Sequence, residues 1–353
     1  MTSIPKSLDE ITPAFLSGLL AERWPGVEVA DIALAGEIHG TATKARLAVD
    51  YARDVGAPQI MWLKAGWEPH SAMLGRVGIY AREPRTYWEL LPKLPARAPQ
   101  CFGAMWDEAA YEGVLLLEDL GETGATLNTP RSEVGVDEVE RMLAMLAGVH
   151  GASAAPGWLD ARAWLEPLFH DFGEPGAYVS YMADPKEIAQ FLQRPRVADY
   201  PRAVCDPDAV HAAMARIGRW AKTPRPHCLL HGDAHIGNSY ADAQGRPGLL
   251  DWQCTRRGGW AYDVAYYMVS ALSTADRRAH ERDLLCGYLA ALSAAGGPAA
   301  DWDAAWEDYT TCLAYGFAAW LSNSTDFQPE EFNAIVSTRF AWAMVDHGVL
   351  RAS

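Results

Sequence analysis

The chain has 353 residues, of which 50% are hydrophobic and 21% are charged, and its formal net charge is −15. This length and apolar content suffice for one large hydrophobic core or two moderate ones. The acidic balance, without any run rich in lysine or arginine, argues against nucleic acid and anionic membranes as partners, because both require a positive surface.

The start of the chain and its cysteines indicate a soluble, cytoplasmic protein. The segment from Met1 to Glu10 lacks the basic and then apolar pattern of a signal peptide. No apolar run approaches the roughly 20 residues that a membrane-spanning helix needs. The six cysteines are dispersed and form no C-x-x-C pair, so neither a disulfide framework nor a zinc site is expected. The oligomeric state stays open.

Residues 1–118 mix short apolar strands with one or two helices and are predicted to form a first domain. Ser7-Leu-Asp-Glu before the apolar run Ile11–Leu20 is typical of a helix start. Strands are expected over Val29–Leu34 and Ala45–Val49.

The loop expected between these two strands contains Gly36 and Gly40. Backbone N–H groups in such a loop could contact phosphates. The sequence has no G-x-G-x-x-G motif, however, and glycine-containing hairpins are also common for purely structural reasons. Phosphate contact by Gly36 and Gly40 is therefore a prediction with a structural alternative.

The apolar run Ile60–Lys64 is predicted to be a buried strand that ends in a lysine. A lysine in that position needs an anionic partner, and Glu83 in a following helix is the best candidate. Pro84 comes directly after it, which places Glu83 near a helix start or a kink and leaves Glu89 as the second candidate. The alternative for Lys64 is an ordinary solvated lysine beyond a strand.

A further buried strand, Val114–Leu117, is followed by Glu118 and leads into a second, mostly helical domain over residues 119–353. The helical pattern there has a period of 3.6 residues and is interrupted by a segment rich in proline, glycine and aromatic residues. Helices are expected over Val136–His150, Pro185–Leu192, Ala209–Ala221, Asp263–Ser270, Asp276–Ala294 and Asp303–Phe317.

The most informative segment is His231-Gly-Asp-Ala-His-Ile-Gly-Asn238, which follows the short apolar strand Cys228–Leu230. It places Asp233 five positions before Asn238, the spacing found in the catalytic loop of protein kinases. A second aspartate, Asp251, follows a predicted hairpin that would return it to the level of Asn238. One carboxylate at an acceptor hydroxyl, with an amide and a carboxylate on Mg²⁺, is the set that phosphoryl transfer requires.

Two other interpretations of this segment remain. His231, Asp233 and His235 alternate, so on a strand they would share one face, as the metal ligands of a hydrolase do. The segment could also be a polar turn without chemistry. Gly232 and Gly237 favour an irregular loop, and His231 is interpreted as a residue that braces it.

The motif His231-Gly-Asp-x-His-x-x-Asn238 with Asp251-Trp-Gln resembles the aminoglycoside phosphotransferase and choline kinase superfamily. Gly258-Gly259, Asp263-Val-Ala-Tyr-Tyr and Val114-Leu-Leu-Leu-Glu-Asp-Leu120 resemble its ecdysteroid-kinase-like branch. The resemblance runs from about residue 30 to about residue 290. It implies a two-lobed α+β fold of the protein-kinase type, with a small β-rich N-terminal lobe and a larger helical C-terminal lobe.

The resemblance also implies a role for each matching residue. ATP would bind between the lobes, with Lys64 on its phosphates and Leu117 and Glu118 in the segment that meets the adenine. Asn238 and Asp251 would hold Mg²⁺, and Asp233 would accept the proton of a small-molecule hydroxyl. Asp263 opens a predicted helix, and one interpretation is that it only caps this helix. In the family the matching residue braces the catalytic loop, and both roles could coexist.

The acceptor is the least specified part of this hypothesis. Trp260, Trp302, Trp306, Trp320 and Trp342 all lie in the second domain, which favours a bulky, largely apolar alcohol. A catalytically silent binding protein with a kinase fold is the alternative in a different class. The choice between ATP and GTP is not contained in the pattern.

Overall fold

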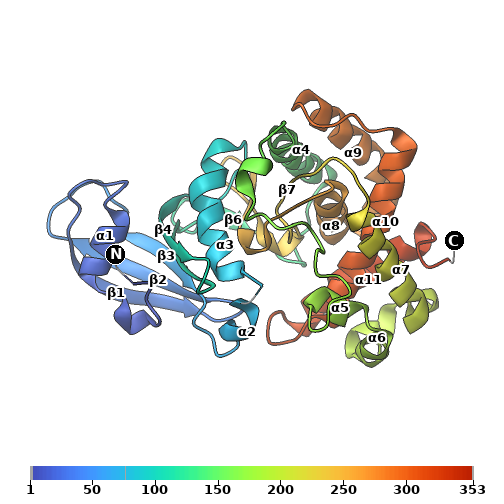
Figure 1. The fold of residues 1–353 in the computed structure, drawn as a ribbon, viewed down its shortest axis with the longest axis horizontal. Coiled ribbons are helices and arrows are strands. Elements are labelled where there is room, and N and C mark those ends of the chain that lie inside the picture. Colours follow the sequence, from blue (N-terminus) through green and yellow to red (C-terminus); the bar gives the residue numbers. More distant parts are fainter. Residues whose placement is uncertain (1–2, 76, 352–353) are drawn as a thin grey trace. The chain divides into compact units, whose positions relative to one another are not determined.

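The computed structural model describes residues 3–75 and 77–351, and they divide into two compact units (Figure 1). The first unit contains the chain up to Thr126 together with Tyr240–Thr255, and the second contains Leu127–Ser239 and the chain from Arg256 onward. The sequence predicted a single boundary at residue 118, whereas a later segment of the chain also belongs to the first unit. Tyr240–Thr255 does so because Leu249 N donates to Arg97 O and Asp251 pairs with Lys64.

The first unit is built on one antiparallel sheet, coloured blue to teal in Figure 1. Its strands lie in the order β1-β2-β3-β5-β4. Their bounds are β1 (Val29–Ile38), β2 (Thr43–Tyr51), β3 (Ile60–Ala65), β4 (Cys101–Asp107) and β5 (Glu112–Glu118).

The two faces of this sheet differ, because side chains alternate along each strand. On β2, Ala45, Leu47 and Val49 are buried in a core that also contains Phe15 and Leu16 of helix α1 (Pro13–Leu20). The intervening residues of β2 and β3 face the other side of the sheet. One face therefore builds the hydrophobic core with α1, and the other carries both polar and apolar side chains, including Lys64 and Trp62.

Helix α1 begins later than the sequence suggested. Thr12 is its N-cap and accepts a hydrogen bond from Phe15 N on Oγ1, and Pro13 occupies the first helical position. Ser7 precedes only a short 3₁₀ turn and makes no capping hydrogen bond. The prediction of Ser7 as the start was wrong because Thr12-Pro13 is the stronger signal.

Helices α2 (Ser71–Gly75) and α3 (Ile79–Arg85) follow β3, and Pro84 lies inside α3. Proline cannot donate to the carbonyl four residues earlier, and the chain continues after α3 as a wider π-helical turn, Thr86–Leu90. A Cβ on Gly113 would lie 2.3 Å from Tyr80 O. The strand can therefore approach the turn that Pro84 interrupts only because residue 113 has no side chain.

The second unit consists mainly of helices, and several begin at an aspartate that caps them. Asp184, Asp206 and Asp301 accept hydrogen bonds from the first backbone N–H groups of their helices. The helices are α4 (Val136–Ser153), α5 (Tyr178–Ala183), α6 (Pro185–Phe191), α7 (Pro207–Lys222), α8 (Ala261–Ala271), α9 (Thr274–Ala294), α10 (Trp302–Ser322) and α11 (Glu330–Asp346).

Helix α8 lies at the centre of this unit, and every one of its residues is buried. Helices α4, α10 and α11 pack against it. A helix that is enclosed on all sides must be apolar or satisfy its polar groups internally. Asp263 and Ser270, the polar residues relevant to the site below, both lie on α8.

Short strands connect the helical elements. β7 (Cys228–Leu230) pairs with β10 (Arg256–Gly258), and β6 (Thr126–Leu127), β8 (Ser239–Ala241) and β9 (Pro247–Leu249) form a three-stranded ladder. The predicted hairpin is confirmed by the pairing of β8 with β9.

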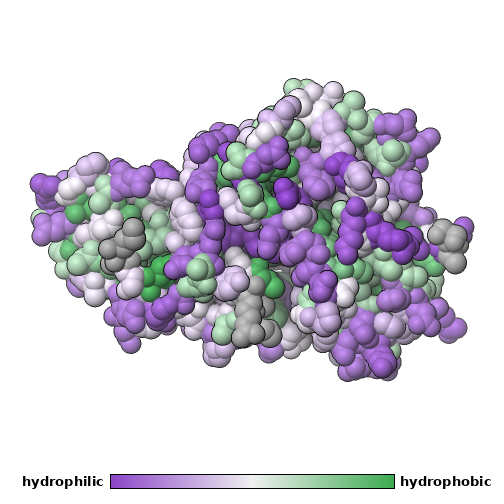
Figure 2. Space-filling model, viewed as in Figure 1, coloured by the Kyte–Doolittle hydropathy of each residue, from purple (hydrophilic) through white to green (hydrophobic). Residues whose placement is uncertain are grey.

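The surface and the cysteines agree with the composition. Hydrophilic residues dominate the face in Figure 2, with hydrophobic residues scattered among them. The six cysteines are free. Among the helices formed by residues 3–75 and 77–351, none has both the length and the apolar character of a membrane span.

Candidate active site

Strand β7 leads into the segment that the sequence singled out, and this segment forms a loop rather than a strand. His231 follows the strand directly, and the loop ends in a 3₁₀ turn, Ile236–Asn238. His235 is the N-cap of that turn, because its Nδ1 accepts a hydrogen bond from Gly237 N at 3.0 Å. The alternation of His231, Asp233 and His235 therefore does not place them on one face of a strand.

Asp233 is held by Asn238. The Nδ2 group of Asn238 donates to Asp233 O at 2.9 Å and to Asp233 Oδ2 at 3.1 Å. The side chain of Asp233 is 26% exposed, so its carboxylate is reachable from solvent. Within the described part of the chain, Asn238 Oδ1 accepts no hydrogen bond and is available to a ligand.

The start of the loop is anchored by Asp263 on α8. Asp263 Oδ2 accepts from His231 N at 2.6 Å, and Oδ1 accepts from Gly232 N at 3.0 Å. The carboxylate is completely buried, and His150 Nε2 lies 3.3 Å from Oδ2. Asp263 thus braces the loop, and the alternative that it only caps its helix does not describe its contacts.

Buried polar side chains from α4, α8 and α9 support this anchor, and the sequence interpretation missed them. His150 Nδ1 lies 2.7 Å from Tyr288 Oη. Ser153 Oγ accepts from Leu229 N at 2.8 Å, and Ser270 Oγ accepts from Ile236 N at 3.0 Å. Single polar residues within apolar helical stripes were the signal that could have identified them, since buried polar groups need partners.

His231 is completely buried, and its Nδ1 accepts a hydrogen bond from Asp233 N at 3.2 Å. Tyr262 Oη donates to Gly232 O at 3.1 Å. These bonds agree with the interpretation of His231 as a bracing residue. Across residues 3–75 and 77–351, no group of three or more His, Cys, Asp or Glu side chains is arranged to hold a metal ion.

In the first unit, Lys64 is the centre of a buried ionic cluster. Its Nζ lies 2.7 Å from Glu83 Oε2 and 2.8 Å from Asp251 Oδ1. Burial alone would lower the pKa of Lys64, but the two carboxylates outweigh it and raise the pKa above its ordinary value. Lys64 is therefore a charged, paired lysine and not a solvated one.

The choice between Glu83 and Glu89 is also settled. Glu89 pairs with Arg85 at 3.0 Å, and Glu83 lies within α3 rather than at its start. Burial raises the pKa of Glu83 to about 7, against the opposing effect of Lys64. The concern raised by Pro84 was misplaced, because the helix tolerates it near its end and Glu83 still reaches Lys64.

Asp251 has an unusual backbone conformation, with φ 65° and ψ 60°. A residue other than glycine in this left-handed region costs about 1–2 kcal/mol, and such strain is found at functional sites. Trp252 holds the conformation, since its ring is completely buried and its Nε1 donates to Leu249 O at 3.1 Å.

The predicted phosphate loop is shorter than expected. β1 extends to Ile38 and β2 begins at Thr43, so Gly36 lies in a strand opposite Arg46 and only Gly40 lies in the turn. The placement of Gly36 in a loop was therefore wrong. A register shift between Leu34 and Gly36 explains it, because the shift lets the strand continue past the glycine.

The predicted adenine-binding residues lie at the end of β5. Leu117 is opposite Trp62 on β3 and is half-buried. Glu118 N donates to Gln100 O at 2.8 Å, and Glu118 Oε2 accepts from Gln100 N at 3.0 Å. The structure thus places Leu117 on the same sheet face as Lys64, since both alternate with core residues.

Several solved structures share this fold. A choline kinase from Streptococcus pneumoniae is 14% identical with a TM-score of 0.50, and the match covers 94% of this chain and 98% of that one. A candidate aminoglycoside phosphotransferase from Ralstonia eutropha is 12% identical (TM-score 0.52; 92% and 96% covered). An ethanolamine kinase from Plasmodium vivax is 9% identical (TM-score 0.53; 90% and 83% covered). A search of the curated proteins finds no match.

The family assignment comes from the sequence itself. The profile of the ecdysteroid kinase-like family matches residues 45–296, well over half of the chain. Together with the shared fold, this match confirms the predicted superfamily and the two-part α+β fold. It also confirms, at the level of the family, the expectation of a small-molecule kinase. The chain belongs to the ecdysteroid kinase-like family.

Proposed function

We propose that the protein transfers the γ-phosphoryl group of Mg-ATP to a hydroxyl group of a small molecule. The observation that carries the proposal is the double restraint on the Asp233 loop, by Asn238 from one side and Asp263 from the other. A catalytic carboxylate must be held in place, because positioning supplies much of the rate of phosphoryl transfer. In this proposal Asp233 orients the acceptor hydroxyl and takes its proton.

The donor set suits magnesium. Asn238 supplies an amide oxygen and Asp251 a carboxylate, and Mg²⁺ prefers such oxygen ligands while it keeps waters and substrate phosphates. We propose these two residues as the protein ligands of the ion. When bound, the ion would neutralise charge that develops on the phosphates.

The first unit supplies groups for the nucleotide. Lys64 would bind its phosphates, and Glu83 would hold the lysine in position from α3. Leu117 and Glu118 are proposed to meet the adenine, and Gly40 in the β1–β2 turn is the remaining candidate for backbone contact with phosphates. Gly36 is a weaker candidate for contact with the phosphates because its backbone is paired within the sheet.

Aromatic side chains pack around His235, two residues after Asp233, in the second unit. The His235 ring contacts Trp320, with centroids 5.0 Å apart, and Tyr266, with centroids 5.8 Å apart. Tyr178 of α5 is 52% exposed. We propose that these aromatic residues, of which Tyr178 is exposed and Trp320 and Tyr266 are buried, form an acceptor surface for a bulky, largely apolar alcohol.

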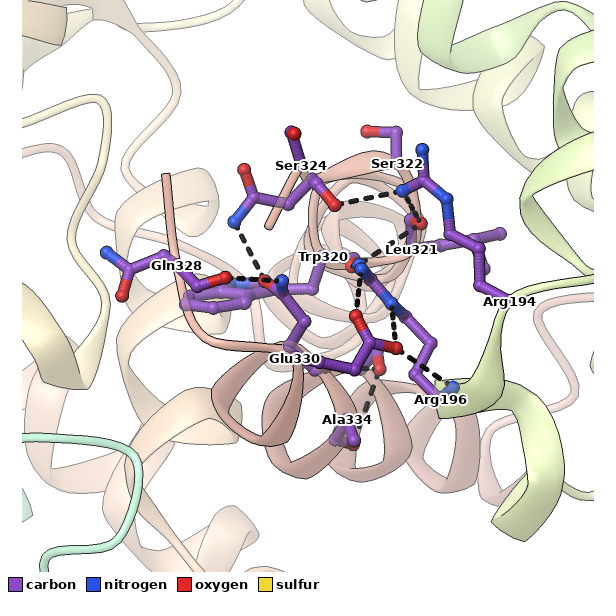
Figure 3. Close-up of polar contacts among 12 residues, drawn as sticks. Arg194, Arg196, Trp320, Leu321, Ser322, Ser324, Gln328, Glu330 and Ala334 are labelled. Atoms are coloured by element: carbon purple, nitrogen blue, oxygen red, sulfur yellow. Dashed lines mark hydrogen bonds and ion pairs between the residues drawn. The ribbon is translucent and has the colours of Figure 1, made fainter. Parts of the chain in front are cut away.

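Two arginines hold the end of α10 that carries Trp320 (Figure 3). Arg196 is buried, donates to Trp320 O and forms an ion pair with Glu330 at 2.6 Å. Arg194 donates to Leu321 O at 3.0 Å, at the end of α10. The last carbonyls of a helix lack partners within the helix, so both arginines fix the end that carries Trp320.

The test combines nucleotide binding with turnover. Thermal unfolding with and without Mg²⁺ and ATP should show a rise in Tm, because a ligand of the folded state stabilises it by mass action. Asp251→Ala should lose the magnesium-dependent part of that rise. Asp233→Asn should keep the rise but lose about 10²–10⁴ in turnover of an accepted alcohol, whereas the exposed Asp283→Asn should change neither.

Near-normal turnover by Asp233→Asn would contradict the role of Asp233. Binding of nucleotide without turnover over a broad panel of alcohols would favour the silent binding protein. The hydrolase alternative predicts activity without ATP. It also predicts that Lys64→Met leaves this activity unchanged.

A further inference from the structure

We propose that Lys44 on β2 is a second phosphate-binding cation that acts beside Lys64. The proposal rests on the proposed function, because it assigns a residue to the same nucleotide site. Neither the catalytic motif nor the Lys64–Glu83 pair identifies Lys44, which in the sequence is one polar residue in an alternating strand.

The register of the sheet places the two lysines side by side. Lys44 is directly opposite Lys64 in the antiparallel pairing of β2 and β3. Opposite residues in such a pair have Cβ atoms about 4.5–5.5 Å apart and point to the same face. That face is the one turned away from the α1 core, because Ala45 and Leu63 belong to the core and alternate with the lysines.

Like charges placed opposite one another destabilise a sheet unless something compensates them. Lys64 has both nearby carboxylates, Glu83 and Asp251, as ion-pair partners. No carboxylate within residues 3–75 and 77–351 lies within ion-pair distance of Lys44 Nζ. Burial, and then the charge of Lys64, lower the pKa of Lys44, whereas Asp251 and Glu83 compensate only in part.

The neighbouring cation on the same face of β2, Arg46, differs from Lys44 because it has ion-pair partners. Arg46, two residues along β2, pairs with Asp119 and with Glu122, both at 2.6 Å. Arg46 is therefore neutralised by residues of its own unit. Lys44 is a partly buried cation beside another cation, and an incoming anion would relieve both the desolvation and the repulsion.

A polyphosphate has the chemistry that this arrangement requires. It carries several negative charges in a row, so one chain can contact two ammonium groups at once. Lys64 stays tied to Glu83 and Asp251, which reduces the positive charge that it offers to a ligand. Lys44 would supply the uncompensated charge and would favour nucleotides with a phosphate chain over the nucleoside.

The experiment measures the affinity for Mg-ATP and for adenosine in the wild type, Lys44→Met and Lys44→Arg. Lys93→Met is the matched control, because Lys93 is an exposed lysine of the same unit. Lys44→Met should weaken Mg-ATP binding about tenfold or more, the size of a lost charge-assisted contact, and leave adenosine binding unchanged. Lys44→Arg should restore most of the affinity, and Lys93→Met should behave as wild type.

The unfolding midpoint without ligand provides a second readout. Lys44→Met should be as stable as the wild type or more stable, because it removes an uncompensated buried charge. Equal loss of Mg-ATP and adenosine affinity, or unchanged Mg-ATP affinity in Lys44→Met, would overturn the proposal while leaving the kinase assignment intact. Failure of the wild type to bind any nucleotide would overturn both.

Discussion

Replacement of Asp263 by asparagine tests whether one buried carboxylate anchors the catalytic loop. Asp263 accepts from two consecutive backbone N–H groups, one on each oxygen. Asparagine keeps one acceptor oxygen and turns an NH₂ group toward the other donor. One buried N–H is then left without an acceptor, and the charge that strengthens the remaining bond is lost.

The magnitude follows from these contacts. A hydrogen bond to a charged group contributes about 1.5–3 kcal/mol, and an unsatisfied buried donor costs about 1–3 kcal/mol. We therefore expect Asp263→Asn to lower the free energy of unfolding by about 3 kcal/mol and to reduce turnover through displacement of Asp233.

Urea denaturation followed by tryptophan fluorescence measures this change, and a turnover assay on the same samples measures its functional consequence. Asp283→Asn on α9 is the control, since it makes the same change of charge on an exposed side chain. A loss below about 1 kcal/mol, within the range of surface substitutions, would refute the reasoning. So would full activity in a destabilised variant, because the loop would then not depend on its anchor.

Two further variants test the acceptor surface and an ionic cluster in which Glu281 of α9 pairs with Arg277 at 2.8 Å and with His347 at 3.0 Å. Burial tends to raise the pKa of Glu281, but His347 and Arg277 outweigh it and lower the pKa below 4.5. The stability that Glu281 contributes is therefore present above its unfolded pKa and is lost as pH falls through the folded value. When the pH is lowered from about 5.5 to about 3.5, the free energy of unfolding should fall less in Glu281→Gln than in the wild type. Urea denaturation at both pH values measures this difference, and equal losses would show that ionised Glu281 does not stabilise the fold. Tyr178→Ala should raise KM for the alcohol several-fold and leave KM for ATP unchanged, and steady-state kinetics that show the reverse would remove Tyr178 from the acceptor surface.

The loop at residues 231–238 was predictable because its information is local. Two glycines, an Asp-to-Asn spacing of five positions and a preceding apolar strand are properties of one short segment. The same holds for Lys64, since a lysine that ends an apolar strand must find an anion wherever the strand lies. Glu83 was predicted as the best candidate, but Glu89 stayed open as the second, because the choice depended on which carboxylate pairs with Arg85.

Helix α11 was missed for a different reason. It buries Asn333 and Ser337 together with Phe340, so its inner face lacks a continuous apolar stripe. Its N-cap, Pro329, makes no capping hydrogen bond through a side chain. Periodicity and capping signals both fail in such a helix, and only its packing partners stabilise it.

The sequence by itself determined the family, the loop at residues 231–238 and most of the helices and strands, because these depend on residue types at short spacing. Only the tertiary structure decided which backbone N–H groups Asp263 holds and that Lys44 lies opposite Lys64. Both relations join residues that are distant in the chain and depend on sheet register or helix packing. A shift of one residue in register would turn Lys44 into the core, and no local pattern records which register the folded sheet adopts.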